Sequence, residues 1–254
     1  MQLKVFPDHD ALSRKAALIV AAHVESNPRT VLGLPTGNSP LGMFRGLVEL
    51  HRTFGLDFSR VRTFNLDEYV GVPGTDPRSF RGYMDQHFFG AVGLTRAQIG
   101  FLDGTMKDLD AECRRYDEAI DAAGGIDLII LGIGPNGHIA FNEPAETFSK
   151  GTCISRLAES TIASIKDFGG PEDVPRRAIT MGVGTLLKCR KILLLASGAS
   201  KAAALREALT GPVSPRCPAT ALQNHPNVEL LLDEAAFAQI APELPLAGVQ
   251  VVRE

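Results

Sequence analysis

The stretch that decides the fold is Leu131-Gly-Ile-Gly-Pro-Asn-Gly-His-Ile-Ala-Phe-Asn-Glu-Pro144. It follows the apolar run 126–131 and contains three closely spaced glycines, with His138 and Glu143 five residues apart. Glycines in such a position let the backbone turn sharply or let a ligand approach closely. A titratable pair directly after the turn is typical of a site that moves protons.

The glycines at 132, 134 and 137 match the spacing of a dinucleotide-binding fingerprint, but their context does not. That fingerprint opens a helix of about 10 or more residues, which packs on the sheet. Here only six residues separate Gly137 from Pro144, and a proline inside a helix costs about 3 kcal/mol. We therefore predict a strand, a glycine turn and an irregular loop that carries His138 and Glu143. The alternative is a tight loop with an ordinary surface histidine.

Composition predicts one globular domain over residues 1–254, because 254 residues with 44% apolar side chains are normal for one α/β domain. The net charge of -3 without a basic block argues against nucleic acid or an anionic membrane as a partner. Apolar runs stay short of the ~20 residues of a membrane span, and residues 1–6 predict a strand rather than a signal peptide. The four scattered cysteines have no metal or redox spacing, which favours free thiols in the cytoplasm.

Strand-like and helix-like segments alternate along the chain. We expect strands at 2–6, 30–34, 61–66, 126–133, 191–196 and 228–232, and helices at 11–25, 41–54, 79–89, 110–123, 200–209 and 234–240. Ser39 is expected to cap the helix at 41–54, and residues 178–187 to hold a glycine-rich turn. Residues 145–175 show no strong period and form a candidate mobile lid. The alternation predicts an α/β fold whose mostly parallel sheet is covered by helices on both faces.

Polar clusters follow four of the predicted strands, at 36–39, 67–69, 136–143 and 197–201. In open α/β sheets, ligands bind beyond the carboxyl ends of the strands. We therefore expect these four clusters to meet in one site.

Two of the clusters suit an anion. Thr36, Gly37, Asn38 and Ser39 join a strand to a helix start, where free N–H groups, a close backbone and two hydroxyls can bind a phosphate. No lysine follows the glycine, so this is not a Walker loop, and the alternative is an ordinary capped turn. Lys201 lies at another helix start, where a bound anion would remove its conflict with the helix dipole; the alternative is a solvated lysine.

Asp67 follows an apolar strand directly, and partial burial there would raise its pKa and make it a base. Glu68 would point elsewhere in an extended backbone, and the alternative role of Asp67 is to cap a turn. The sequence thus supplies a phosphate cradle, a carboxylate base and a His–carboxylate pair. It shows no metal-ligand cluster and no Ser or Cys nucleophile beside a base. These parts suit proton transfers on a small sugar phosphate.

Four motifs together resemble one known family, the glucosamine-6-phosphate deaminases. They are Gly33-Leu-Pro-Thr-Gly37, Phe64-Asn-Leu-Asp-Glu-Tyr-Val-Gly71, Gly137-His-Ile-Ala-Phe-Asn-Glu-Pro144 and Gly182-Val-Gly-Thr-Leu186. The resemblance covers nearly the whole chain. It implies a modified Rossmann-type three-layer sandwich, and the conversion of glucosamine 6-phosphate and water to fructose 6-phosphate and ammonia without a metal or organic cofactor.

The resemblance also implies roles for single residues. His138 would transfer the proton that opens the pyranose ring, and Glu143 would orient and charge it. Asp67 would move a proton from carbon 2 to carbon 1 through an enolamine. Residues 36–39 and Lys201 would hold the phosphate of the amino-sugar substrate.

The chain departs from the family pattern in three places. Asn136 stands where the best-known members have a relay Asp; its amide oxygen would accept from the imidazole without charge, so His138 should rely mainly on Glu143. Lys166 is the nearest match to a phosphate-binding Arg of the lid, and we expect it to substitute. The positions that bind an activator in regulated members are different here, which predicts no activation by N-acetylglucosamine 6-phosphate. These positions are Glu146, Cys153, Ser155 and Arg156.

Three alternative functions stay open from the sequence. A 6-phosphogluconolactonase shares the fold and a related glycine–histidine loop, but lacks the joined motifs at 64–69 and 138–144. A non-catalytic sugar-phosphate sensor would carry a helix-turn-helix segment, for which the chain has no room. An isomerase for galactosamine 6-phosphate differs only in sugar stereochemistry. The family includes monomers and larger assemblies, so a homo-oligomer is compatible with the sequence.

Overall fold

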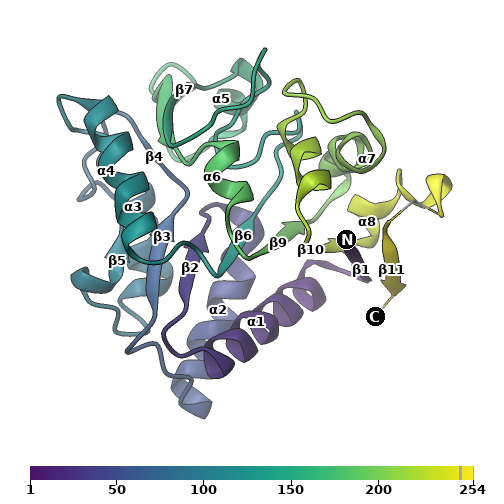
Figure 1. Ribbon diagram of the computed structural model, residues 1–254, viewed down its shortest axis with the longest axis horizontal. Helices are drawn as coiled ribbons and strands as arrows, with labels where there is room; N and C mark the ends of the chain where they lie inside the picture. Colours follow the sequence, from purple (N-terminus) through teal and green to yellow (C-terminus); the bar gives the residue numbers. More distant parts are fainter. Residues whose placement is uncertain (246–247, 254) are drawn as a thin grey trace.

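The computed structural model describes residues 1–245 and 248–253 and is built on an eight-stranded sheet (Figure 1). The strand order is β11-β1-β10-β9-β6-β2-β3-β5, and all neighbouring strands are parallel. The strands are β1 (Gln2–Phe6), β2 (Val31–Leu34), β3 (Arg62–Asn65), β5 (Ile99–Gly100), β6 (Leu128–Leu131), β9 (Lys191–Ala196), β10 (Val228–Asp233) and β11 (Gln250–Arg253).

Helices cover both faces of this sheet. The α-helices of the described residues are α1 (His9–Ser26), α2 (Asn38–Phe54), α3 (Phe80–Met84), α4 (Leu109–Ala122), α5 (Glu159–Ser164), α6 (Val183–Leu187), α7 (Ala202–Thr210) and α8 (Glu234–Phe237), of which α5 packs in a separate small core. Short helical segments are the π-helix η1 (Asp85–Phe89) and the 3₁₀ turns η2 (Arg96–Gln98), η3 (Ala199–Lys201), η4 (Pro218–Asn224) and η5 (Ala241–Glu243).

The apolar residues of the central strands divide between two cores, because successive side chains of a strand point to opposite faces. Leu128 and Ile130 of β6 pack in the core formed with α1 and α2, whereas Ile129 and Leu131 pack in the core formed with α4, α6, α7 and α8. Figure 1 shows α1 and α2 side by side along one side of the sheet. The expected α/β sandwich of three layers with a parallel central sheet is confirmed.

One expected helix start is wrong. Helix α2 begins at Asn38, with Gly37 as its N-cap, so Ser39 lies inside the first turn and does not cap it. The reason is the φ of +95° at Gly37, a value that glycine adopts without strain. It lets the chain turn from β2 into the helix with the cap at residue 37, two residues earlier than the expected cap at Ser39.

A second, antiparallel sheet was not foreseen. Its strands are β4 (Asp67–Tyr69), β8 (Arg177–Thr180) and β7 (Cys153–Arg156), in the order β4-β8-β7. The sequence predicts that residues 67–69 follow the strand at 61–66, that residues 178–187 hold a glycine-rich turn, and that residues 145–175 have no strong period; it indicates no strand in the last two segments. Strands of three or four residues contain too few alternations to give a periodic pattern, which is why all three were missed.

The segment 145–175 contains β7 and α5 and shares a small apolar core with residues of β4, β8 and the loop 132–144. This core consists of Tyr69, Val72, Phe141, Leu157, Ile162, Phe168, Val174 and Ala178. The segment therefore packs directly on β4, through ring contacts such as that of Phe168 with Tyr69, whose centroids are 5.5 Å apart. That this segment moves as a lid stays a prediction. That residues 1–254 form one domain also stays a prediction.

The carboxyl-terminal part also differs from expectation. We expected 228–232 to be the last strand, but β11 follows and pairs with β1 at the edge of the sheet, which places the two chain ends close together (Figure 1). Helix α8 ends at Phe237 rather than at 240. Among the described residues no helix is long and apolar enough to cross a membrane.

Candidate active site

The strands are all parallel, but the direction in which the chain adds them to the sheet reverses between β2 and β6. From β2 the chain adds β3 and β5 toward one edge, and from β6 it adds β9 and β10 toward the other. Loops that leave the carboxyl ends of such a neighbouring pair diverge and open a crevice, where ligands of open α/β sheets bind. After β2 the loop is residues 35–37, and we call residues 35–39 the anion turn. After β6 the loop is residues 132–144, which we call the glycine loop.

The glycine loop is a closed turn followed by an irregular segment, as the sequence predicts. The Gly134 N–H donates to the His138 carbonyl at 2.9 Å, and the Gly137 N–H donates to the Gly134 carbonyl at 3.0 Å. A Cβ on Gly134 would lie 2.3 Å from the His138 ring, so the absence of a side chain lets the imidazole pack on the turn. Gly137 has a φ of +82°, and a Cβ there would lie 2.4 Å from Sγ of Cys217.

Replacing Gly137 with alanine should destabilise the protein by about 3 kcal/mol, since the left-handed backbone strain adds to the clash with Cys217. For a chain of this size, the midpoint of thermal unfolding should then fall by about 6–12 °C, which calorimetry measures. Gly124→Ala is the matched control: its φ of +87° is similar, but a Cβ there meets nothing within 4 Å. An equal loss in both variants would show that Cys217 imposes no constraint.

His138, Glu143 and Asn136 form one hydrogen-bonded group. Nδ1 of His138 lies 3.4 Å from Oε2 of Glu143, and Nδ2 of Asn136 donates to the same oxygen at 2.7 Å. The Asn136 amide oxygen accepts from the backbone N–H of His138 at 3.2 Å. The bond from the imidazole that this oxygen could accept is not present among the described residues. Asn136 instead holds the carboxylate against the ring, because its two ends bond the backbone of the turn and Glu143.

Glu143 is held as an anion although it is largely buried. Burial acts to raise the pKa of this carboxyl, but bonds from His138, Thr161 and Asn136 outweigh it, and the net pKa lies below the usual value. Its second oxygen accepts from the backbone N–H of Ala158 at 3.2 Å, just before α5. The segment 145–175 thus touches the carboxylate that sets the charge beside His138.

Asp67 is buried in β4, with 7% of its surface exposed. Burial, and next to it the negative charge of Glu68, raise the pKa of the Asp67 carboxyl to about 8. A base that is buried in this way is strengthened, since its neutral form is favoured.

The segment of Leu66 and β4, which carries Asp67, and the glycine loop are both hydrogen-bonded or paired to the same two residues, Thr180 and Met181. Asp67 is paired with Thr180 across the antiparallel sheet, and the Met181 N–H donates to the Leu66 carbonyl at 2.8 Å. From the other side, the Phe141 N–H donates to Oγ1 of Thr180 at 3.1 Å, and Nδ2 of Asn142 donates to the Met181 carbonyl at 2.8 Å. Asp67 and the His138–Glu143 pair therefore lie at the same end of the molecule.

Glu68 has a role that the sequence did not reveal. Glu68 is buried, with 1% of its surface exposed. Oε1 accepts from the N–H groups of Tyr69 at 2.8 Å and Phe80 at 3.0 Å, and Oε2 accepts from that of Arg81 at 3.0 Å. Burial raises the pKa of Glu68 to about 7 against the effect of these bonds. The carboxylate thus anchors the first turn of α3 to β4, a contact between segments that no local pattern indicates.

The anion turn has backbone donors that no side chain of the described residues caps. Helix α2 has no side-chain cap, and Pro40 carries no N–H, so the amides of Asn38 and Ser39 are the donors of its first turn. Gly37 and Asn38 are exposed, and Thr36 is half-buried. These features suit a phosphate, and the assignment stays a prediction.

The two expected lysines lie in different settings. Lys201 is half-buried at the start of α7, and burial lowers the pKa of its ammonium. Lys166 is exposed after α5, and its ammonium donates to the carbonyl of Ala163 at 3.2 Å. This bond directs the Lys166 side chain to the carboxyl end of α5. That Lys166 takes the phosphate-binding role of a lid arginine stays a prediction, and no contact of the described residues supports it.

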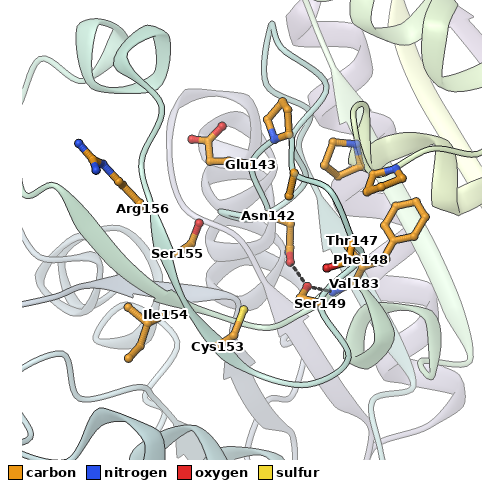
Figure 2. A pocket seen from close by; sticks show the side chains of 14 residues that line it. Asn142, Glu143, Thr147, Phe148, Ser149, Cys153, Ile154, Ser155, Arg156 and Val183 are labelled. Carbon is orange, nitrogen blue, oxygen red and sulfur yellow. Dashed lines mark hydrogen bonds between the residues drawn. The ribbon is translucent and has the colours of Figure 1, made fainter.

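A cavity of about 260 Å³ lies behind Glu143, on the β7 side of the glycine loop (Figure 2). Figure 2 shows Asn142 at its wall, bonded to Ser149, which in turn accepts from the Val183 N–H at 2.9 Å. Neither the anion turn nor Asp67 lines this cavity, whereas Asn142 and Glu143 of the glycine loop do. Three of the four expected activator positions line it: Cys153, Ser155 and Arg156.

Comparison with known proteins places the chain in a family. Residues 7–231 match the family described as glucosamine-6-phosphate isomerases/6-phosphogluconolactonase. A glucosamine-6-phosphate deaminase of Thermoanaerobacter pseudethanolicus (strain ATCC 33223 / 39E) is 44% identical over 253 residues, 99% of this chain and 100% of that protein. One of Halothermothrix orenii (strain H 168 / OCM 544 / DSM 9562) is 47% identical over 237 residues, 93% of this chain and 98% of that protein.

Solved structures agree. One described as a monomeric glucosamine-6-phosphate deaminase superposes with a TM-score of 0.91 at 41% identity and covers 94% of this chain and 100% of its own. A 6-phosphogluconolactonase from Leishmania guyanensis superposes with a TM-score of 0.73 at 20% identity, over 93% of this chain and 97% of its own, and shows the shared fold alone. The chain belongs to the glucosamine-6-phosphate isomerase/6-phosphogluconolactonase family, which confirms the resemblance seen in its motifs.

Proposed function

We propose that this protein is a glucosamine-6-phosphate deaminase, which isomerises and deaminates glucosamine 6-phosphate to fructose 6-phosphate and ammonia. The observation that carries the proposal is the attachment of both Asp67 and the His138–Glu143 loop to Thr180 and Met181. That attachment fastens the strand of the buried Asp67 carboxyl and the loop of the His138–Glu143 pair to neighbouring residues, which supports their joint action on one substrate. The curated relatives of this name at 44% and 47% identity support the same activity.

The anion turn and Lys201 bind the phosphate in this proposal. The sugar then extends toward the glycine loop, where His138 delivers a proton to the ring oxygen and takes one from the hydroxyl of carbon 1, so that the pyranose opens. Glu143, ionised and hydrogen-bonded, stabilises the positive charge that the imidazole gains during this transfer.

Asp67 performs the isomerisation. In its ionised form it removes the proton from carbon 2 of the open chain and returns a proton to carbon 1, through an enolamine. Water then adds at carbon 2, and ammonia leaves. A single carboxylate on one face of the substrate can make both transfers only if the open chain is held still, which is the role of the anion turn.

The test is to incubate the purified protein with glucosamine 6-phosphate and measure ammonia. Galactosamine 6-phosphate and 6-phosphogluconolactone are run in parallel, with product acid measured for the lactone. Ammonia from the glucosamine substrate alone is expected. Hydrolysis of the lactone alone would make the protein a lactonase, preference for the galactosamine substrate would correct the stereochemistry, and no turnover of any substrate would favour a sensor.

We expect N-acetylglucosamine 6-phosphate to leave the rate unchanged. Glu146 occupies one of the activator positions, and its carboxylate engages Arg216, which is then not available to bind the phosphate of that compound. Cys153 and Ser155 carry no positive charge, which leaves Arg156 alone to bind one. Rates measured over a range of substrate concentrations should be hyperbolic with and without the compound. A sigmoidal curve that becomes hyperbolic on its addition would contradict this.

The enzyme acts in the cytoplasm, in keeping with the free state of Cys113, Cys153, Cys189 and Cys217. It works without a metal or an organic cofactor. In the described part of the chain, no three His, Cys, Asp or Glu side chains come together as a metal site.

A further inference from the structure

Tyr83 connects the anion turn to a different part of the chain. Its hydroxyl donates to the Gly37 carbonyl at 2.7 Å, although the two residues are 46 positions apart. Gly37 is the N-cap of α2, and the donors of the turn follow it directly. The bond therefore fixes the orientation of the peptide between Gly37 and Asn38. That peptide carries the Asn38 N–H and precedes the Ser39 N–H.

The hydroxyl is a permanent donor in its setting. Burial raises the pKa of the Tyr83 phenol above its already alkaline ordinary value, with Arg45 and Asp167 as the charged groups that act on it. The ring packs on His87, with the ring centroids 4.6 Å apart. Tyr83 is thus held in one orientation by its ring and bonded at its tip.

The helix that carries Tyr83 is fixed to the strand of the base. The Glu68 carboxylate accepts from the N–H groups of Phe80 and Arg81, both at 3.0 Å, at the start of α3. Ser79 caps the same turn by accepting from the Gly82 N–H at 2.9 Å. Since Glu68 adjoins Asp67 in β4, a short rigid path runs from the base through α3 to the anion turn.

A second contact holds the other side of the turn. Nε2 of His9 lies 3.2 Å from the Ser39 carbonyl, so the carbonyls of Gly37 and Ser39 are both engaged. Among the described residues, no side chain caps the amides of Asn38 and Ser39. Engaged carbonyls and uncapped amides leave the turn with donors pointing outward, the arrangement that an anion requires.

We infer that Tyr83 is a positioning residue of the phosphate site, and that α3 is the brace that sets the anion turn at a constant distance from Asp67. This rests on the proposed function and deepens it, because the anion of the turn is the phosphate of the substrate. Tyr83 touches the turn and not the reacting carbons, so it acts on phosphate binding rather than on the proton transfers.

The experiment compares the full-length wild type with Tyr83→Phe. Binding of inorganic phosphate is measured directly by calorimetry, without turnover, and KM and kcat are measured with glucosamine 6-phosphate. The loss of one hydrogen bond that aims the donors should raise the phosphate Kd and the KM together by about 5- to 10-fold, with kcat within about twofold. Because phosphate binding needs no catalysis, a wild type that binds phosphate but releases no ammonia would refute the proposed function and leave this inference intact.

Tyr116→Phe is the matched control. It also removes a tyrosine hydroxyl that donates to backbone carbonyls, those of Asn65 at 2.7 Å and Gly100 at 3.2 Å, but none in the anion turn. Its phosphate Kd should equal that of the wild type. The inference is overturned if Tyr83→Phe keeps the wild-type phosphate Kd, if Tyr116→Phe weakens phosphate binding as much, or if Tyr83→Phe lowers kcat with KM unchanged.

Discussion

Asp67→Asn should lower kcat for ammonia release by about 10³- to 10⁴-fold, the largest effect that we expect from a single substitution. The amide has nearly the shape of the carboxylate but cannot accept the proton of carbon 2. In the wild type, kcat/KM should fall as the pH drops below about 8, because the buried carboxyl has a pKa of about 8 in the empty site and only its ionised form is a base. Initial rates between pH 6 and 9 measure both effects.

The same variant should be more stable than the wild type at alkaline pH. The carboxyl binds its proton up to about pH 8 when folded but only to about 3.8 when unfolded. Between these values the folded state binds more protons, so the free energy of unfolding of the wild type decreases as the pH rises. The amide that replaces the carboxyl in the variant does not titrate and has no such dependence. Thermal unfolding at pH 8.5 should therefore occur at a higher temperature in Asp67→Asn, with little difference at pH 4.

Near-wild-type turnover in Asp67→Asn would remove the base from the mechanism. If the variant were less stable than the wild type at pH 8.5, ionisation of Asp67 would not lower the free energy of unfolding of the wild type, and its pKa would not be raised. The two readouts separate a chemical role from a structural one, because a misfolded variant would lose both activity and stability.

Glu143→Gln should lower kcat/KM by about 10²-fold, the second largest effect. The amide cannot stabilise the positive charge that His138 acquires during ring opening, and hydrogen bonds to charged groups are about twice as strong as neutral ones. The loss should exceed that of most single hydrogen bonds, since the carboxylate lies 3.4 Å from Nδ1 of the imidazole in a largely buried place. The rate of ammonia release at saturating and at low substrate concentrations gives the comparison.

Asn136→Ala is the control for this effect. It keeps the charge of Glu143 but removes the 2.7 Å bond that holds the carboxylate, so we expect a loss of about 5- to 10-fold. Equal losses in the two variants would mean that Asn136, and not the charge, determines the rate. A turnover of Glu143→Gln within twofold of the wild type would show that the Glu143 carboxylate does not stabilise the charge on His138 during ring opening.

The local parts of the candidate site were predictable from the sequence. The glycine turn at 132–137 follows from the run of glycines before a proline, and β9 matches its expected range of 191–196. Asp8 caps α1 by accepting from the Ala11 N–H, as such a residue does before an apolar period. Each of these features depends on neighbours within a few positions, and the motifs around them were sufficient to indicate the family.

What only the tertiary structure decided is the set of contacts between segments far apart in the chain. The sequence by itself determined a parallel α/β sandwich, its polar strand ends and the chemical types of its candidate residues. It did not show that Asp67 lies in a second sheet bonded to Thr180, that Asn136 bonds Glu143 and not the imidazole, or that Glu68 and Tyr83 link β4 to the anion turn. Short strands have no periodicity, and the partner of a buried polar group is set by packing, so these contacts arise only when the chain is folded.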